Sequence, residues 1–352
     1  MSIAITRAET LKRKPDSDKL GFGQYFSDHM FLMNYDEGQG WHDARLVPYA
    51  PFLLEPAAMV FHYAQEVFEG LKAYRRADGG IQLFRPDMNI ARMRVSCERL
   101  CIPPVDDALY LEAIKALVDL ERDWVPSEPD TSLYLRPFII ATEPHIGVHA
   151  SKSYIFAIIA SPVGAYYSGG INPVKIYVET KDVRAVKGGM GHTKTGGNYA
   201  ATLRAGKQVE KFGFSQVLWL DGIHRKYIEE VGAMNVFFRF GDEIATPALQ
   251  GSILPGVTRD SCLAILRDWG LNVNERVIDA VELNHCDEAW GTGTAAVISP
   301  IGEISYDGRQ ISINNGQIGN LTQKLYDFLT GIQWGRVPDP FGWTVPVEQR
   351  TN

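Results

Sequence analysis

The sequence predicts a mixed α and β protein of two domains. Its 352 residues exceed the roughly 100–200 residues that one domain usually takes, and 45% of them are hydrophobic. Short apolar runs of strand length alternate along the chain with segments whose apolar residues recur at helical spacing. A chain of this length and composition can bury a large core, so we expect most of it to be folded.

Strand and helix signals follow one another through both halves of the chain. Alternating or β-branched apolar residues mark the strands, and apolar residues three or four positions apart mark the helices. In the first half we expect strands at Ile81–Phe84, Ser132–Ala141 and 153–160, with helices at 86–100 and 107–124. In the second half we expect strands at Val174–Glu179, Gln216–Leu220 and 233–240, with helices at 199–212, 258–269 and 317–334.

A break in this pattern separates the two halves. Proline and glycine follow the apolar run in the stretch from Ser161 to Gly170, and these residues interrupt regular strands and helices. We therefore predict an N-terminal α/β domain over residues 1–163, a linker loop over 164–172 and a larger C-terminal α/β domain over 173–352.

Charge and hydropathy exclude several classes of partner. Lysine and arginine number 35 against 42 aspartates and glutamates, for a net charge of −7, and no basic run could neutralise the phosphates of a nucleic acid. No segment offers the roughly 20 apolar residues that span a bilayer, and residues 1–20 lack the apolar stretch of a signal peptide. We expect a cytoplasmic protein that binds neither nucleic acid nor membrane.

The histidines do not indicate a metal site. His145 and His149 are four positions apart, but Gly147 lies between them and no HExxH helix surrounds them. We predict that the protein holds no metal.

One lysine lies in an unusually glycine-rich segment. Lys194 belongs to the stretch 188–199, whose glycines let the backbone come close to a ligand. A phosphate-binding loop of the Walker type needs glycine directly before the lysine, and Thr193 stands there. Most lysines are solvated surface groups, but these surroundings and the Asn198-Tyr199 pair make Lys194 a candidate for catalysis.

Two segments have the character of an anion-binding site. Residues 254–259 precede and begin a helix, whose first N–H groups favour a phosphate. Residues 291–296 fit the GxGxxG/A pattern of dinucleotide-binding proteins, although no convincing acidic partner follows about 20 positions on, because Asp307 and Gly308 have the signature of a hairpin turn. A tight connection between two strands explains this second segment equally well.

Two carboxylates complete a possible set of cofactor ligands. Glu229 and Glu230 precede an apolar strand, where such residues are solvated by default. A carboxylate held beside a pyridine-type nitrogen would keep that nitrogen protonated and make the ring an electron sink. A lysine, a phosphate cradle and a glutamate together suggest pyridoxal phosphate as cofactor.

A series of motifs in order along the chain resembles one family. They occupy residues 22–30, 67–74, 83–86, 132–137, 162–166, 194–199, 216–220, 230–235, 253–259 and 291–295. With these motifs the chain resembles the branched-chain amino acid aminotransferases, which are pyridoxal-phosphate enzymes of fold type IV. The resemblance implies two α/β domains with the active site in the cleft between them, and a reversible ping-pong transfer of the amino group between leucine, isoleucine or valine and 2-oxoglutarate.

The resemblance also implies a role for particular residues at the cofactor. Lys194 would form the Schiff base and then move a proton between the substrate α-carbon and C4′ of the cofactor. Glu230 would pair with the ring nitrogen, and Tyr199 would hydrogen-bond the ring 3′-oxygen. The phosphate would be held by Arg92, by the backbone of Val257 and Thr258, and by the hydroxyl of Thr294.

The substrate pocket follows from the same resemblance. The backbone N–H of Ala295 would bind the substrate carboxylate, and Arg136 would bind the distal carboxylate of glutamate. The wall would be formed by Phe26, Tyr63, Phe68, Tyr134 and Met234, although ordinary core packing is the alternative for the aromatic residues. Ile146 and Val148 would reach into the site of a partner subunit, which implies a homodimer.

The sequence departs from the family pattern at two places. Some members carry a CxxC redox pair after the Gly-Thr-Ala segment, and here those positions are Ala296 and Ser299, so a thiol switch is absent. Position 233 is alanine where several relatives have threonine, which puts one substrate-backbone hydrogen bond in doubt.

Other functions remain open at this point. Within the same fold, a D-amino acid aminotransferase or an aminodeoxychorismate lyase is the alternative. A nucleotide-dependent oxidoreductase would use the segment at 291–296 instead. A binding protein without activity is disfavoured because Lys194 and Glu230 are both present.

Overall fold

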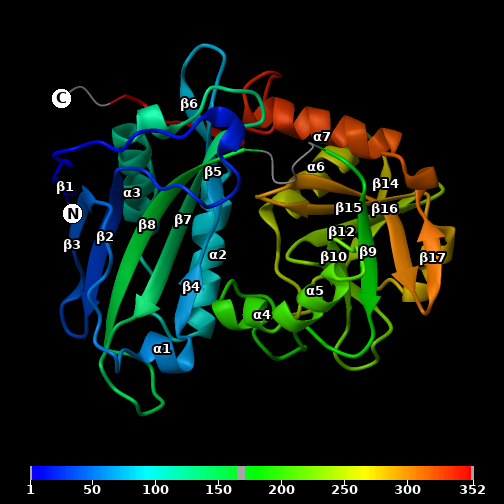
Figure 1. The fold of residues 1–352 in the computed structure, drawn as a ribbon, viewed down its shortest axis with the longest axis horizontal. Coiled ribbons are helices and arrows are strands. Elements are labelled where there is room, and N and C mark those ends of the chain that lie inside the picture. Colours follow the sequence, from blue (N-terminus) through cyan, green and yellow to red (C-terminus); the bar gives the residue numbers. More distant parts are fainter. Residues whose placement is uncertain (1, 165–170, 350–352) are drawn as a thin grey trace. The chain divides into compact units, whose positions relative to one another are not determined.

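The computed structural model describes residues 2–164 and 171–349, which form two compact units (Figure 1). Of these residues, the first unit takes 2–164, Thr193–Gly196 and 331–349. The second unit takes 171–192 and Gly197–Thr330. Residues 165–170 of the expected linker lie outside the described residues, and the domain boundaries expected from the sequence remain a prediction.

One mixed sheet forms the base of the first unit. Among the described residues its strands pair in the order β1 (Ala4–Ile5), β3 (Gly40–Pro48), β2 (His29–Asp36), β8 (Ser153–Val163), β7 (Ser132–Ala141), β5 (Leu71–Arg75), β6 (Ile81–Phe84) and β18 (Thr344–Pro346), while β4 (Glu66–Phe68) pairs with β7. The helices of this unit are α1 (Met59–Tyr63), α2 (Pro86–Arg99) and α3 (Asp107–Leu120), with 3-10 turns at Ser17–Lys19 and Arg122–Trp124.

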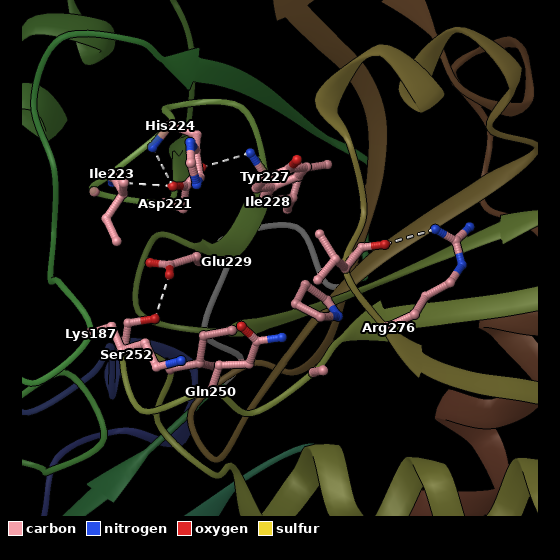
Figure 2. A pocket seen from close by; sticks show the side chains of 15 residues that line it. Lys187, Asp221, Ile223, His224, Tyr227, Ile228, Glu229, Gln250, Ser252 and Arg276 are labelled. Atoms are coloured by element: carbon pink, nitrogen blue, oxygen red, sulfur yellow. Dashed lines mark hydrogen bonds between the residues drawn. The ribbon is translucent and has the colours of Figure 1, made fainter.

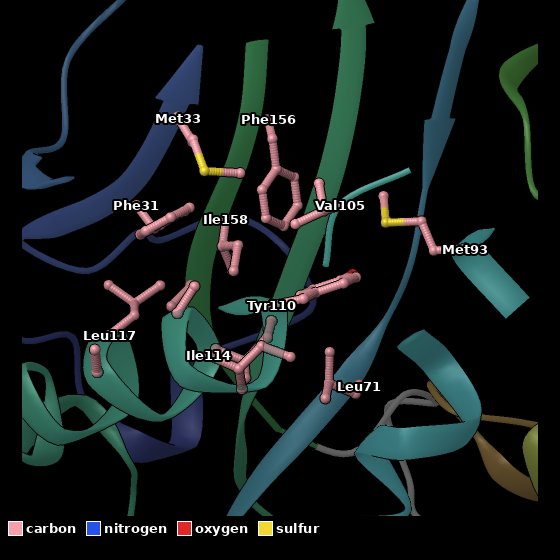
Figure 3. Close-up of a cluster of buried hydrophobic side chains, with 14 of the residues drawn as sticks. Phe31, Met33, Leu71, Met93, Val105, Tyr110, Ile114, Leu117, Phe156 and Ile158 are labelled. Carbon is pink, nitrogen blue, oxygen red and sulfur yellow. The ribbon is translucent and has the colours of Figure 1, made fainter. Parts of the chain in front are cut away.

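The alternation of side chains along the strands divides this sheet into two faces. Leu133 and Leu135 of β7 belong to the hydrophobic core, and Ile114 and Leu117 of α3 pack into the same cluster. Figure 3 shows this core, with Phe156 of β8 and residues of α3 among its labelled side chains. Because successive residues of a strand point to opposite faces, the even-numbered residues of this part of β7 lie on the other face.

The second unit contains another mixed sheet. Among the described residues its strands pair in the order β11 (Ile228–Val231), β10 (Gln216–Leu220), β9 (Val174–Glu179), β16 (Val297–Tyr306), β15 (Glu288–Gly293), β12 (Asn235–Phe240), β13 (Glu243–Pro247) and β14 (Asn272–Arg276), while β17 (Arg309–Ser312) pairs with β16. The helices are α4 (Gly196–Ala200), α5 (Leu203–Glu210), α6 (Val257–Asp268) and α7 (Asn320–Gln333), with 3-10 turns at Ala280–His285 and Asn314–Gly316. Gly196 of α4 and the end of α7 from Gly331 belong to the first unit.

Two elements differ from the sequence-based expectation. Strand β8 continues to Val163 instead of ending near residue 160. Its last residues pair with β7 alone, so Pro162 occupies an edge position where its missing N–H costs no ladder bond. The helix expected at 199–212 is broken into α4 and α5, because the hydroxyl of Thr202 donates to the carbonyl of Tyr199 at 2.7 Å and competes with the helical pattern.

The GxGxxG/A segment is a connection between strands. Strands β15 and β16 are antiparallel neighbours, and Gly293 pairs with Val297 across the turn. A dinucleotide-binding fingerprint requires a helix directly after its strand. The segment therefore does not have the structure of that fingerprint. The Asp307-Gly308 turn is confirmed as a hairpin between β16 and β17.

Within the described ranges, helices fall short of the length and apolar character needed to cross a membrane.

A buried polar network fastens the N-terminal segment to the first unit. The backbone N–H of Ala8 donates to His29 Nε2 at 2.8 Å, so His29 Nδ1 carries the proton and donates to Glu121. The other oxygen of Glu121 accepts the N–H of Asp28 at 2.9 Å. Trp124 Nε1 donates to Asp28 at 2.6 Å. Glu121 thus accepts two buried donors and needs both carboxylate oxygens to satisfy them.

We predict that Glu121→Gln destabilises the protein by about 2–4 kcal/mol, because an amide can accept only one of these two buried donors and leaves the other facing an NH₂ group. Urea denaturation of the apoprotein measures the change. Asp123→Asn is the matched control, since the Asp123 side chain is 86% exposed and lies 3.6 Å from Lys14; its effect should stay within about 0.5 kcal/mol. Equal effects of the two substitutions would contradict the structural importance of the network.

Candidate active site

The backbone of Lys194 is held by two elements of the first unit. Its N–H donates to the hydroxyl of Ser96 on α2 at 3.0 Å. Its carbonyl accepts the N–H of Phe68 on β4 at 3.0 Å. A helix and a strand that are distant in sequence therefore fix the segment from which the lysine side chain extends.

The ammonium of Lys194 lies in surroundings that favour its neutral form. Part of the residue remains exposed, but its Nζ sits 4.8 Å from the centroid of the Phe68 ring. Burial lowers the pKa of Lys194 to about 8, and the positive charge of Arg92 adds to this effect. Glu69 opposes the shift. The amine is therefore far more available as a base or nucleophile at neutral pH than an ordinary lysine.

Glu69 and Arg92 form a buried bidentate ion pair next to this lysine. Arg92 Nε and Nη2 donate to the two carboxylate oxygens of Glu69 at 2.7 and 2.8 Å, and Asn89 donates to Glu69 at 2.8 Å. Burial alone would raise the pKa of Glu69, but Arg92 outweighs burial and holds that pKa below its usual range. The pair fixes the guanidinium of Arg92, which the sequence suggested as a phosphate ligand.

Glu66 supports the residues directly after Lys194. Its carboxylate accepts the backbone N–H of Gly196 and lies 3.4 Å from the hydroxyl of Thr195. A Cβ atom at Gly196 would approach Glu66 Oε1 to 2.6 Å, so the close contact requires glycine. Burial raises the pKa of Glu66, and its hydrogen bonds and Arg136 partly offset this rise.

Phe68, Tyr134 and Arg136 gather on the face of the first sheet that is turned away from the core. The Arg136 guanidinium lies 4.8 Å from the Phe68 ring centroid and donates to the Tyr134 hydroxyl at 3.1 Å. Arg136 Nε and Ser161 Oγ are buried without a hydrogen-bond partner in the described part of the chain. Ser161 pairs with Tyr134 across β7 and β8. Unpaired buried donors of this kind suit a polar ligand such as a carboxylate.

The other residues suggested for the substrate pocket lie elsewhere in the first unit. Tyr63 ends α1, and its hydroxyl donates to the carbonyl of Ile146. Ile146 and Val148 are 70% and 84% exposed. Phe26 stacks on Tyr49 with ring centroids 5.2 Å apart.

Glu230 is the centre of a polar group in the second unit. It is buried on β11, and its Oε2 atom lies 2.7 Å from Arg184 Nη1. Asn235 Nδ2 lies 3.3 Å from the other oxygen of Glu230 and donates to the carbonyl of Leu254 at 2.9 Å. Asn235 thereby connects Glu230 to the segment that begins α6.

The start of α6 has the form of a phosphate cradle. Gly256 is its N-cap, and no side chain caps the first N–H groups, which belong to Val257 and Thr258. A Cβ atom at Gly256 would lie 2.0 Å from Asn235 Oδ1, so only glycine allows this approach. Helix N-termini favour anions. The donor set therefore fits the phosphate of pyridoxal phosphate.

The turn after β15 contributes further groups of the second unit. Thr294 and Ala295 occupy this turn and are partly exposed. Met234 lies against Gly291, where a Cβ atom would approach the Met234 methyl group to 2.9 Å. The hydroxyl of Thr292 is buried without a partner in the described ranges. Tyr199 belongs to α4, five residues after Lys194.

The structure thus sorts the residues suggested by the sequence into two groups. Lys194, Arg92, Phe68, Tyr134 and Arg136 come together in the first unit. In the second unit, contacts join Glu230 to the start of α6, and Met234 to the strand that leads to Thr294. Sequence reasoning missed several polar residues of these groups, namely Glu66, Glu69, Asn89, Ser96, Ser161, Arg184 and Asn235. For Glu69 and Asn235 a signal existed, since each is a buried polar residue inside an apolar motif.

The second unit also contains a pocket on the far side of β11 from Glu230. Figure 2 shows Glu229 directed into this pocket, which has a volume of about 260 Å³. Ser252 donates its hydroxyl to Glu229. The wall formed by Asp221 is held in place because its carboxylate accepts four backbone N–H groups of residues 223–227.

We predict that Lys194 in the apoprotein titrates with a midpoint near pH 8, where its labelling by pulses of acetic anhydride rises as the neutral amine forms. Peptide mass spectrometry measures this labelling, with Nα-acetyl-lysine amide in the same tube as reference. Arg92→Gln should move the midpoint to higher pH, because the positive neighbour is lost, and Glu69→Gln should move it to lower pH. A midpoint near 10.4 in the unaltered protein would contradict the environment described here.

Comparisons with known proteins agree with this arrangement of residues. The sequence matches the Amino-transferase class IV family over residues 66–304. It is 54% identical to branched-chain-amino-acid transaminase 1 of Bacillus subtilis, over 99% of this chain and all of that protein. It is 48% identical to the branched-chain-amino-acid aminotransferase of Mycobacterium tuberculosis, over 97% and 95% of the two chains.

Solved structures give the same result. The structure superposes on the Escherichia coli branched-chain amino acid aminotransferase with a TM-score of 0.78 and 25% identity, covering 91% of this chain and 99% of that one. For the enzyme of Thermoproteus uzoniensis with norvaline, the TM-score is 0.77 at 26% identity, covering 91% and 100%. Members of this class use pyridoxal phosphate. From its sequence and its fold, this chain belongs to the class IV amino-transferase family.

Proposed function

We propose that the protein is a branched-chain amino acid aminotransferase that holds pyridoxal phosphate on Lys194. It transfers the amino group reversibly between leucine, isoleucine or valine and 2-oxoglutarate. The observation that carries the proposal is the position of Lys194, whose amine is desolvated beside Arg92 and Glu69 and has its pKa lowered to about 8.

The cofactor supplies an aldehyde for the amino group and a ring that accepts the electron pair left when the α-carbon loses its proton. Lys194 Nζ takes that proton and returns it on the other side of the reaction. A lysine with a pKa near 8 exists in both protonation states at neutral pH, and a general acid–base group works best under this condition.

Residues of the second unit hold the ring and its phosphate. Glu230 pairs with the ring nitrogen, and Tyr199 donates to the 3′-oxygen. The N–H groups of Val257 and Thr258 and the hydroxyl of Thr294 bind the phosphate, together with Arg92. The uncapped start of α6 and the glycine at position 256 support the phosphate site.

The substrate is held by groups of both polarities. Ala295 N–H binds its α-carboxylate, and Phe26, Tyr63, Phe68, Tyr134 and Met234 accommodate a branched side chain. Arg136 binds the distal carboxylate of glutamate, which the unpaired Nε of that guanidinium supports. The high exposure of Ile146 and Val148 supports their insertion into the site of a second copy in a homodimer.

We predict that the purified protein is yellow after incubation with pyridoxal phosphate. Leucine should abolish the visible absorption band and 2-oxoglutarate should restore it, because the two half-reactions pass the amino group in turn. Lys194→Arg should abolish the exchange, since an arginine stays protonated. Borohydride treatment and peptide mapping should place the label on Lys194. A response to D-alanine but not to leucine would instead favour a D-amino acid aminotransferase.

We predict that Arg136→Gln raises the KM for 2-oxoglutarate by about tenfold or more and changes the KM for leucine by less than about threefold. Only the oxo acid brings a second carboxylate, and losing one charge-assisted contact costs about this much. Lys115→Gln is the matched control for the loss of a cation, because Lys115 lies on α3 away from these contacts. Steady-state kinetics with each substrate varied in turn measures the difference. Equal losses for both substrates would contradict this role of Arg136.

A further inference from the structure

The two neighbouring carboxylates of β11 have different surroundings. Glu229 and Glu230 are consecutive in the strand, so their side chains point to opposite faces. Glu229 is half-buried and lines the pocket of Figure 2. Glu230 is only 3% exposed. A carboxylate that is buried so deeply needs charged or hydrogen-bonding partners to remain ionised.

Arg184 is the charged partner of Glu230. Its Nη1 atom lies 2.7 Å from Glu230 Oε2 and donates to the carbonyl of Ser252 at 3.2 Å. The Arg184 residue is itself only 8% exposed. The carbonyl of Ser252 is fixed in turn, because a Cβ atom at Gly191 would approach it to 2.1 Å. The guanidinium is therefore buried and is attached at both ends of its contact.

Asn235 completes the support of the same carboxylate. It approaches Glu230 Oε1 at 3.3 Å, opposite the oxygen that Arg184 contacts. Both oxygens of Glu230 thus face a donor, and one orientation of the carboxylate is favoured over a rotated one. A planar guanidinium also favours the ionised form of its partner.

We propose that Arg184 is a positioning residue for Glu230, which it keeps ionised and oriented toward the ring nitrogen of the cofactor. This inference rests on the proposed function, in which Glu230 pairs with that nitrogen. Without Arg184, the buried carboxylate takes up a proton, because a lone charge is costly in the interior. It then no longer offers an ionised acceptor to the protonated ring, and the stronger, charge-assisted hydrogen bond is lost.

The test compares two ligands that differ in one ring atom. Apoprotein is titrated with pyridoxal phosphate and with its 1-deaza analogue, in which a C–H group replaces the ring nitrogen. Arg184→Gln should weaken binding of pyridoxal phosphate by about tenfold or more. Binding of the analogue should change by less than about twofold, since it has no nitrogen for Glu230 to meet. Arg184→Lys, which keeps the charge, should recover part of the lost affinity.

A double-mutant comparison shows whether Arg184 acts through Glu230. In a Glu230→Gln background, Arg184→Gln should weaken pyridoxal phosphate by less than about twofold further, because the carboxylate it serves is already gone. Glu229→Gln is the matched control, since it changes the adjacent carboxylate on the opposite face and retains the oxygen that accepts from Ser252. It should leave both affinities unchanged.

The outcomes separate this inference from the proposed function. Equal losses for the two ligands, or full multiplication of the Arg184 and Glu230 effects, would show a general structural role and overturn the inference alone. Failure of the unaltered chain to bind pyridoxal phosphate would overturn the proposed function and this inference with it. Urea denaturation of each variant identifies any that fails to fold, and Arg184→Lys then supplies the same comparison of ligands.

Discussion

The chemistry of the first unit depends on one ammonium group that has been taken out of water. Burial and the positive charge of Arg92 drive Lys194 toward its neutral form, while Glu69 restrains that tendency. The opposing charges are themselves joined in a bidentate ion pair, so neither can move without the other. Hydrogen bonds from Ser96 and Phe68 fix the lysine backbone, which keeps the amine at this balance of charges.

Strand alternation lets the same residues build the core and the polar surface. Leu133 and Leu135 enter the hydrophobic cluster, while Tyr134 and Arg136 between and after them face the other side with Phe68. Strand β11 repeats the principle in the second unit, where Glu230 and Glu229 point in opposite directions. A shift of either strand by one residue would exchange the two sets, so packing of the core also fixes the register of the polar groups.

The sequence predicts the groups that local patterns mark and misses those that only tertiary contacts create. Lys194 and the start of α6 have glycines as signals, and the alternation at Ser132–Ala141 places Tyr134 and Arg136 correctly on one face. The family and the mixed fold are confirmed, whereas the individual roles at cofactor and substrate remain predictions. Arg184 and Ser161 carry no periodicity or motif. Their importance arises when segments far apart in sequence meet, as Arg184 meets Ser252 and Glu230.

The helix expected at 199–212 illustrates a second limit. Its composition favours a continuous helix, but a single hydroxyl at Thr202 bonds to the carbonyl three residues earlier and divides it. Strand β8 shows the reverse, since Pro162 looks like a terminator and yet sits in a strand whose second neighbour has already ended. Neither outcome can be read from propensity, because each depends on which backbone groups already have partners.

The network around His29 gives the first residues of the chain a structural duty. The backbone N–H groups of Ala8 and Lys12 satisfy His29 Nε2 and Asp28 Oδ1, which are buried acceptors deep in the first unit. A shortened version beginning after residue 12 would strip both acceptors of their donors at once. The amino-terminal strap therefore works as a plug for the interior, and affinity tags or fusions belong at the opposite end.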